Sequence, residues 1–159
     1  MYGFQISEMW QENESTKYGA YRFRLNDLSM LFRISKITPT KVGQFVTLWK
    51  RNSDSGQIQP FDISDELDFF VICSCKDRDF GKFVFPRSVL LDKGIISENN
   101  IGGKRAMRVY PPWDKPTNKQ AEKTQLWQLK YFSNITNARQ IIRKGDTLPL
   151  LYHKEDNPC

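Results

Sequence analysis

A series of short strand-like segments in the first two thirds of the chain limits its possible folds more than any other part of the sequence does. Turn residues separate these segments. Residues 21–25 alternate apolar and cationic side chains, which is the period of a strand with one buried face. Asn26 and Asp27 then give a turn signal before a second strand at 30–34, so these two strands are expected to form a hairpin. Further strands are expected at 44–49, 69–73, 82–85 and 107–110, and a tight charged turn at 76–79 is expected to join the strands 69–73 and 82–85 in a second hairpin. The segment 69–73 is apolar throughout and is expected to be a central strand that is buried on both faces.

Helical patterns follow later in the chain. A short helix is expected at 87–93, and a longer one at 117–132, where Thr117 and Gln120 give a capping-box signal. A third, shorter helix is expected at 138–144, before a polar tail from about residue 146. Strands joined by short turns, with the helices gathered late, predict an α+β fold. We therefore expect a mostly antiparallel sheet of five to six strands, with the C-terminal helices packed on one face.

Length and composition favour one domain spanning residues 1–159. The chain has a mass of 18.7 kDa, a hydrophobic content of 39% and a mean hydropathy of −0.59. No stretch approaches the roughly 18 to 20 consecutive apolar residues that a membrane-spanning helix needs. The N-terminus lacks a basic region followed by an apolar segment, so no secretion signal is expected. These features predict a cytoplasmic protein.

Charge is distributed unevenly along the chain, whose net charge is +6. Residues 17–51 contain eight Lys and Arg side chains and one Asp, whereas residues 52–79 carry a net charge of −5. This segregation favours a bipolar surface, with a basic face for an anionic partner and an acidic loop elsewhere. In the alternative, the acidic loop folds against the basic strands and neutralises them.

The basic segment 36–51 contains no acidic residue, and its cations lie beside a tryptophan. Cations next to an exposed aromatic ring suggest an anionic partner with flat, stackable rings, which describes a nucleic acid. Alternation also places Arg22 and Arg24 on one face of their strand, where they could follow a phosphate backbone. The candidate nucleic-acid-binding residues of this part of the chain are Arg22, Arg24, Arg33, Lys36, Thr38, Lys41, Gln44, Trp49, Lys50 and Arg51. A solvated basic face without a partner is the alternative.

A second candidate group combines cations with aromatic residues on a rigid turn. Lys104, Arg105 and Arg108 precede Tyr110, two prolines and Trp113. Such a turn could offer phosphate contacts beside stacking surfaces, but the same rings could equally pack against the sheet.

The expected C-terminal helix carries a third group. Gln125 and Gln128 share an otherwise apolar face of this helix. A glutamine amide can recognise an adenine edge, and it can also satisfy backbone groups nearby.

Four segments resemble the MepB-like family. They are KITPTKVGQFVTLWKR (36–51), GKFVFP (81–86), KRAMRVYPPW (104–113) and QLWQLKYF (125–132). With their order and spacing, the resemblance covers roughly residues 17–132. It implies a small bacterial protein of a kind often encoded beside a multidrug efflux pump, and it implies no particular catalytic residue.

Residues for familiar catalytic chemistry are scarce. Cys73 and Cys75 are expected to be core cysteines, because they lie in an apolar run and one His in the whole chain cannot complete a zinc site with them. No Lys has an Asp or Glu two residues before it, as a metal-dependent nuclease of the restriction-enzyme type requires. Carboxylates that an atypical nuclease could use are Glu12, Glu14, Asp62, Asp65, Glu66 and Asp68. We expect no catalytic residue, no metal and no cofactor.

The sequence as a whole predicts a non-catalytic protein that binds nucleic acid, either single-stranded or distorted, with low sequence specificity. Many aromatic residues and no duplex-reading motif favour single strands or ends over a regular duplex. A divergent metal-dependent nuclease is one alternative. The other is an accessory protein of multidrug efflux that receives a cationic small molecule or a protein.

Overall fold

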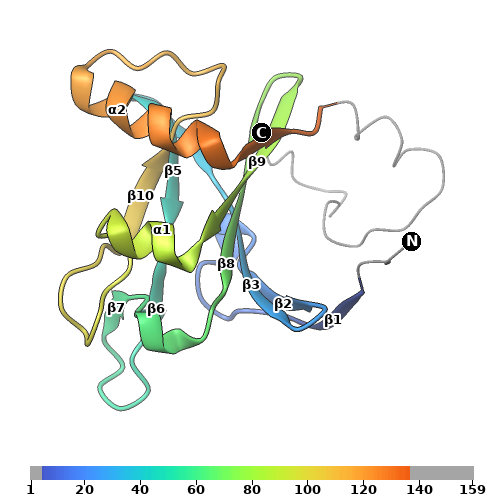
Figure 1. Cartoon of the computed structure of the whole chain (residues 1–159), viewed down its shortest axis with the longest axis vertical. Helices are drawn as coiled ribbons and strands as arrows, with labels where there is room; N and C mark the ends of the chain where they lie inside the picture. The colour runs from blue at the N-terminus through green and yellow to red at the C-terminus, as the bar shows by residue number, and fades with distance from the viewer. Residues whose placement is uncertain (1–4, 137–159) are drawn as a thin grey trace.

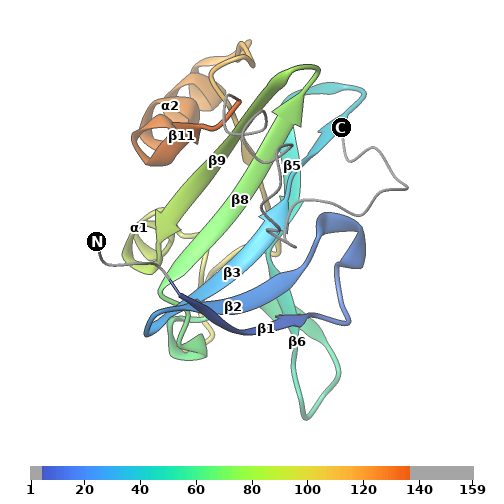
Figure 2. The ribbon, with the colours of Figure 1, turned by 90° about the vertical axis from the view of Figure 1, so that its right-hand side faces the viewer.

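Two sheets and a layer of helices enclose the main core in a computed structural model that describes residues 5–136 (Figure 1). The large sheet has six strands in the order β1-β2-β3-β8-β9-β11. Their bounds are β1 Ile6–Gln11, β2 Tyr21–Leu25, β3 Leu28–Ile34, β8 Phe69–Lys76, β9 Asp79–Pro86 and β11 Phe132–Asn134. Neighbouring strands are antiparallel except for β3 and β8, which run parallel. The expected α+β domain with a mostly antiparallel sheet is therefore confirmed (Figure 2).

Both hairpins expected from local signals are present. Tyr21 of β2 pairs with Phe32 of β3, and the turn between them contains Asn26 with a positive φ of 55°. The strands β8 and β9 pair along their whole length around the turn after Lys76. An asparagine tolerates the left-handed conformation better than most residues, so local turn chemistry accounts for the first hairpin.

A second, small sheet was not expected. It contains β4 (Lys36–Thr38), β5 (Lys41–Thr47) and β10 (Ala106–Val109), in the order β10-β5-β4. The strand expected at 44–49 is divided, because β5 ends at Thr47 and Trp49 begins β6 (Trp49–Arg51), which pairs with β7 (Ile58–Pro60) as a two-stranded ribbon. The prediction of a single sheet that includes 44–49 and 107–110 is thus wrong.

Ser35 marks the point where the chain leaves the large sheet for the small one. Its hydroxyl is buried and lies 2.8 Å from Oε1 of Gln44, 2.7 Å from the Ser74 hydroxyl and 3.1 Å from the Cys73 carbonyl. Gln44 in turn donates to the Cys75 carbonyl at 3.1 Å. This buried polar network joins the two sheets where they diverge, and its groups are hydrogen-bonded as buried polar groups must be.

The main core lies between the large and the small sheet. The large sheet contributes Leu31, Phe70, Ile72, Phe83 and Phe85, and the small sheet contributes Val46, Met107 and Val109. A second apolar cluster covers the opposite face of the large sheet and contains Phe23, Met30, Phe32, Val71 and Cys73. The strand β8 is consequently buried on both faces, as its apolar sequence predicted, and Cys73 and Cys75 are both buried.

The helices α1 (Arg87–Asp92) and α2 (Lys119–Gln128) lie on the same side of the large sheet (Figure 1). The N-cap of α2 is Asn118, whose side chain accepts from the Ala121 N–H at 2.9 Å, so the capping box predicted at Thr117 is wrong. A short 3-10 turn, Leu129–Tyr131, follows α2, and Phe132 then begins β11. The helix ends earlier than predicted because β11 pairs with β9.

Two sequence predictions concern the C-terminal part of the chain. The helix expected at 138–144 and the tail from 146 lie outside the described residues. Within residues 5–136, no helix is long and apolar enough to cross a membrane.

Candidate nucleic-acid interface

The predicted arginines of β2 and β3 are largely occupied by internal partners. Arg22 and Arg24 do lie on one face of β2, but Arg22 donates from Nε to Glu12 at 2.5 Å and its guanidinium lies 5.4 Å from the centroid of the Phe61 ring. Arg33 also donates to Glu12, and it is 1% exposed. Burial lowers the pKa of the Arg33 guanidinium, and the Glu12 charge opposes this shift. The expectation that Arg33 contributes to an open basic face is therefore corrected.

Arg24 differs from its neighbour on β2. It donates to the Asp27 carbonyl at 2.9 Å and lies 3.9 Å from a Glu8 oxygen, at an exposed position. Arg24 therefore remains at the surface, whereas Arg22 on the same face of β2 is held against Glu12 and Phe61.

The cations of β6 also have partners. Arg51 donates to Glu14 at 2.7 Å and to the Gly56 carbonyl at 2.9 Å, and its guanidinium lies 5.6 Å from the Trp49 ring centroid. Lys50 forms an ion pair with Asp65 in the acidic loop. At this pair the acidic loop does fold against a basic strand, which was the alternative to a bipolar surface.

The three predicted glutamines bind backbone groups. Gln44 and Gln128 are buried, at 1% and 0% exposure. Gln128 accepts from the Tyr110 N–H at 2.8 Å and donates to the Arg108 carbonyl at 2.9 Å, and Gln125 donates to the carbonyls of Pro111 (3.0 Å) and Asp114 (2.8 Å). Their amides hydrogen-bond to backbone groups, which was one of the two alternatives predicted from the sequence. This arrangement does not support the other alternative, recognition of an adenine edge by Gln125 and Gln128.

Arg108 and Tyr110 tie the end of β10 to the β4–β5 turn. Arg108 donates to the Gly43 carbonyl at 2.9 Å and to the Thr38 hydroxyl at 2.7 Å. The Tyr110 ring packs directly on Gly43, where an added Cβ would lie 2.6 Å from Cε1 of that ring. These residues position the turn that carries Lys41.

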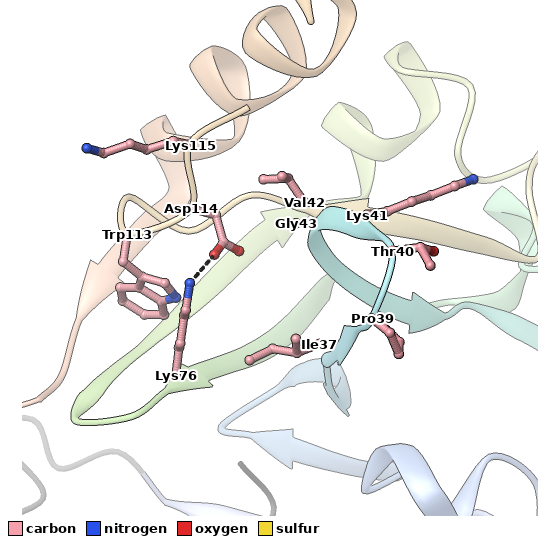
Figure 3. Close-up of a pocket in the computed structure, with 10 residues that line it drawn as sticks. All are labelled: Ile37, Pro39, Thr40, Lys41, Val42, Gly43, Lys76, Trp113, Asp114 and Lys115. Carbon is pink, nitrogen blue, oxygen red and sulfur yellow. Dashed lines mark ion pairs between the residues drawn. The ribbon is translucent and has the colours of Figure 1, made fainter. Parts of the chain in front are cut away.

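The turns of the two predicted groups meet at an open groove of about 450 Å³ (Figure 3). It lies between the β4–β5 turn, the end of β8 and the turn that follows β10. Its walls are formed by Ile37, Pro39, Thr40, Lys41, Val42, Gly43, Lys76, Trp113, Asp114 and Lys115. Lys41, from the first predicted group, and Trp113, from the second, thus both line this one groove.

Three lysines belong to this groove. Lys76 reaches from the end of β8 to Asp114, with 3.5 Å between Nζ and Oδ1, whereas Lys41 and Lys115 extend away from the centre on its two sides (Figure 3). Neither Lys41 nor Lys115 forms an ion pair with any residue in the range 5–136. Lys36, Lys104 and Arg105 are exposed elsewhere and do not line the groove.

Asp114 is an incompletely satisfied carboxylate on the groove wall. It is 8% exposed, and among residues 5–136 only Lys76 contacts its side-chain oxygens. Burial raises the pKa of Asp114, while the Lys76 charge acts in the opposite direction. The neighbouring Trp113 packs edge-on against Phe132, with 5.6 Å between ring centroids, and its indole Nε1 is buried without a partner in the described structure.

Asp62 shows what a structural carboxylate looks like in the same protein. It accepts hydrogen bonds from the N–H groups of Ser64 and Asn100 and from the hydroxyls of Ser64 and Ser97. Burial by itself would raise the pKa of Asp62, but these four hydrogen bonds together lower it well below the ordinary value. Within residues 5–136, Asp114 has no comparable set of donors.

The sequence did not single out Lys76, Asp114 or Lys115. Lys76 ends a buried strand, and Asp114 and Lys115 follow Trp113 directly. The only available signal for the last two was that they continue the turn already selected for Tyr110 and Trp113.

Five of the six carboxylates considered for an atypical nuclease have structural partners. Glu12 binds Arg22 and Arg33, Glu14 binds Arg51, and Asp68 accepts from the Ser29 N–H at 2.8 Å. Asp62 and Asp65 cap each other's backbone in a capping box. Within residues 5–136 there is no group of three or more His, Cys, Asp or Glu side chains that could hold a metal ion.

Fold and groove together define a sheet-rich α+β domain whose groove combines lysines, an aromatic ring and one buried carboxylate. The MepB-like family profile matches residues 12–134. A crystal structure of MepB is similar over 81% of this chain and 86% of that chain, with 36% sequence identity and a TM-score of 0.78. A comparison with curated proteins found no match. The chain belongs to the MepB-like family.

Proposed function

We propose that this protein binds single-stranded or distorted nucleic acid in the groove, with low sequence specificity and without catalysis. The observation that carries the proposal is the junction of the β4–β5 turn and the turn after β10, where Trp113, Lys41 and Lys115 line one groove and neither lysine has an ion-pair partner among residues 5–136. Elsewhere the predicted basic residues are mostly engaged within the protein. Lys36, Lys104 and Arg105 are also exposed without an ion pair among residues 5–136, but the groove is where such cations line one surface together with Trp113.

The arrangement of the groove suits a single strand. Lysines on its two sides can contact successive phosphates, and each phosphate contact releases counterions and strengthens binding at low salt. On the groove wall, Trp113 and the exposed apolar side chains Ile37 and Val42 offer surface to an unpaired base. A base that is paired in a regular duplex cannot reach such a surface without leaving its stack.

Fluorescence anisotropy with a labelled single strand and the matching duplex, at about 50 and 200 mM salt, tests this proposal. We expect tighter binding of the single strand and a loss of affinity with added salt. In Lys41→Ala/Lys115→Ala, the slope of log affinity against log salt should become shallower by about 1.4, since each single-strand phosphate contact contributes about 0.7. Absence of binding at the lower salt concentration would end the proposal.

Lys123→Ala/Lys130→Ala is the matched control. It removes two exposed lysines from α2 and the 3-10 turn after it, outside the groove, and changes the net charge equally. An equal change of slope in both double variants would show that net charge, and not the groove, determines binding.

A further inference from the structure

We infer that the groove prefers an unpaired guanine, because Lys76 and Asp114 together complement the Watson–Crick edge of that base. This inference rests on the proposed function, since it names the base that the nucleic-acid groove receives. The two side chains lie 3.5 Å apart at the groove wall, directly beside Trp113 (Figure 3).

Hydrogen-bonding capacity of the two side chains distinguishes the bases. An ionised carboxylate only accepts hydrogen bonds, through two oxygens, and an ammonium group only donates. The Watson–Crick edge of guanine presents one acceptor, O6, followed by two donors, N1–H and N2–H. Lys76 can therefore donate to O6 while both oxygens of Asp114 accept from the neighbouring donors. Adenine, cytosine and thymine each have only one hydrogen-bond donor group on this edge: N6 in adenine, N4 in cytosine and N3 in thymine. With any of these bases, one Asp114 oxygen therefore receives no hydrogen bond from the base.

The surroundings of Asp114 keep this capacity available. Its backbone is fixed on both sides, because its N–H donates to the Pro111 carbonyl at 3.0 Å and its own carbonyl accepts from Gln125 at 2.8 Å. Its carboxylate, by contrast, receives no hydrogen bond from a backbone N–H or a hydroxyl group of residues 5–136, and its partner there is the Lys76 ammonium group. A buried carboxylate whose donor is one partly exposed lysine can accept further hydrogen bonds from a ligand.

Lys76 completes the arrangement from the opposite side. Its side chain is 45% exposed, so its ammonium group can turn toward a ligand while it stays near Asp114. A lysine presents three donors on a flexible stem, and it can thus serve a base oxygen and the carboxylate together.

Anisotropy with thymine single strands that carry one guanine, inosine, adenine or cytosine at the centre tests the inference on the unmodified protein. Inosine retains O6 and N1–H but lacks the N2 amino group. We expect the guanine strand to bind about tenfold more tightly than the other three, which is the range that a bidentate contact contributes to base discrimination. Equal affinities for guanine and inosine would overturn the inference.

Asp114→Asn tests the residue that is assigned to this preference. The asparagine keeps the shape of the side chain but replaces one acceptor oxygen with a donor, so the guanine preference should fall to about twofold or less. Asp92→Asn removes the same charge at an exposed position on α1 and should retain the full preference. A guanine preference that survives in Asp114→Asn would also overturn the assignment.

The outcomes separate this inference from the proposed function. Binding of all four strands with equal affinity, and with the salt dependence of the groove lysines, would remove the guanine preference and leave nucleic-acid binding intact. Failure of every strand to bind at low salt would remove both.

Discussion

Asp62 and Asp114 are both almost fully buried, yet their environments shift their pKa values in opposite directions. A carboxyl group whose pKa is raised by folding favours the folded state when it is protonated. Its contribution is complete below the pKa of the unfolded chain and is lost as the pH rises through the folded pKa. A carboxyl group whose pKa is lowered by folding behaves in the reverse manner and stabilises the folded state at neutral pH.

We therefore predict opposite effects of the two isosteric substitutions. Asp114→Asn should raise the melting temperature at pH 7, because it removes a buried charge whose only contact among residues 5–136 is the partly exposed Lys76. This gain should disappear toward pH 3, where the wild-type carboxyl is protonated in both states. Asp62→Asn should lower the melting temperature at pH 7, since a donor then faces the groups that donate to Asp62.

Thermal unfolding followed by circular dichroism between pH 3 and 8 measures both effects, with the exposed Asp92→Asn as the control. A lower melting temperature of Asp114→Asn at pH 7 would contradict the prediction. A higher one, together with a loss of guanine preference, would show a carboxylate that is retained at the expense of stability, as binding sites often require.

Gly43 is the residue at which the groove wall depends most on the absence of a side chain. Its φ is 81°, and a Cβ would lie 2.6 Å from the Tyr110 ring. Gly56 has a similar φ of 70° but no atom within 4 Å of such a Cβ. The pair separates backbone strain, which both share, from the clash with Tyr110.

Gly43→Ala should lower the free energy of unfolding by about 2–5 kcal/mol, the sum of left-handed strain and overpacking. Gly56→Ala should lower it by only about 1–2 kcal/mol, from strain alone. Urea denaturation of both variants gives the comparison. Equal losses would mean that Tyr110 moves away without cost and that the groove wall is more adaptable than its packing indicates.

At the scale of secondary-structure elements, the unusual feature is the outer edge of β10. This strand pairs with β5 on one side only. On its other side, Gln128 of α2 accepts from the Tyr110 N–H and donates to the Arg108 carbonyl, as a neighbouring strand would. One side-chain amide thereby satisfies two backbone groups and fixes α2 against the turn that leads to Trp113.

Gln128→Leu should lower the free energy of unfolding by about 2–4 kcal/mol, because it leaves a backbone N–H and a carbonyl unpaired next to the helix. It should also weaken nucleic-acid binding, because the turn carrying Trp113 and Asp114 loses a support. The control is Gln120→Leu, an exposed position on the same helix, which should change stability by no more than about 0.5 kcal/mol. Urea denaturation and the anisotropy measurement test the two effects separately, and a loss of less than about 1 kcal/mol in Gln128→Leu would contradict the role of the amide.

Elements that depend on neighbours in the sequence were predictable from it. The β2–β3 and β8–β9 hairpins follow from alternation and turn residues, and the burial of β8 follows from its apolar run. The parallel pairing of β3 with β8 and the separate small sheet depend on contacts between distant segments, for which periodicity gives no signal. The strand β1 escaped prediction because it is exposed along its length and its pairing is interrupted near Glu8, which has a φ of 51°.

The candidate site was predictable to a similar extent. Lys41 and Trp113 were found because each lies in a segment with a distinctive composition of cations and aromatics. Lys76 and Asp114 were missed because single charges at the end of a strand and in a turn look like ordinary surface residues. Arg33, conversely, was assigned to the surface because a sequence cannot show that Glu12 is folded over it and neutralises it in the interior.

The net charge of the whole chain is +6, but within residues 5–136 carboxylates neutralise part of the predicted basic strands. Glu12, Glu14 and Asp65 come from segments outside the basic strands and pair with four of the predicted cations, namely Arg22, Arg33, Arg51 and Lys50. The basic segment is thus partly neutralised by its own fold, and the available charge is restricted to particular sites. For a weak, general attraction to polyanions the total charge suffices, but a defined binding mode requires a site such as the groove.

The two sheets and α1 share one core, so the described part of the chain should unfold as a single cooperative unit. Residues of the large sheet, the small sheet and α1, among them Phe85, Val46 and Leu90, belong to one buried cluster. Trp127 contacts that cluster at Phe85, with 5.4 Å between ring centroids, whereas Trp49 lies in the separate two-stranded ribbon. Tryptophan fluorescence of Trp49→Phe therefore reports on the core through Trp127, whereas that of Trp127→Phe also reports on the ribbon through Trp49.

We predict that, within each of the two variants, tryptophan fluorescence and far-ultraviolet circular dichroism give the same urea midpoint. The slope of the free energy with urea should be about 1–3 kcal/mol per molar, as for other small proteins that unfold in one step. A ribbon that unfolds independently would appear as an earlier fluorescence transition in Trp127→Phe, which retains Trp49, without a matching change in circular dichroism. That result would contradict a single domain and would place the ribbon, with Lys50 and Arg51, outside the cooperative core that positions the groove.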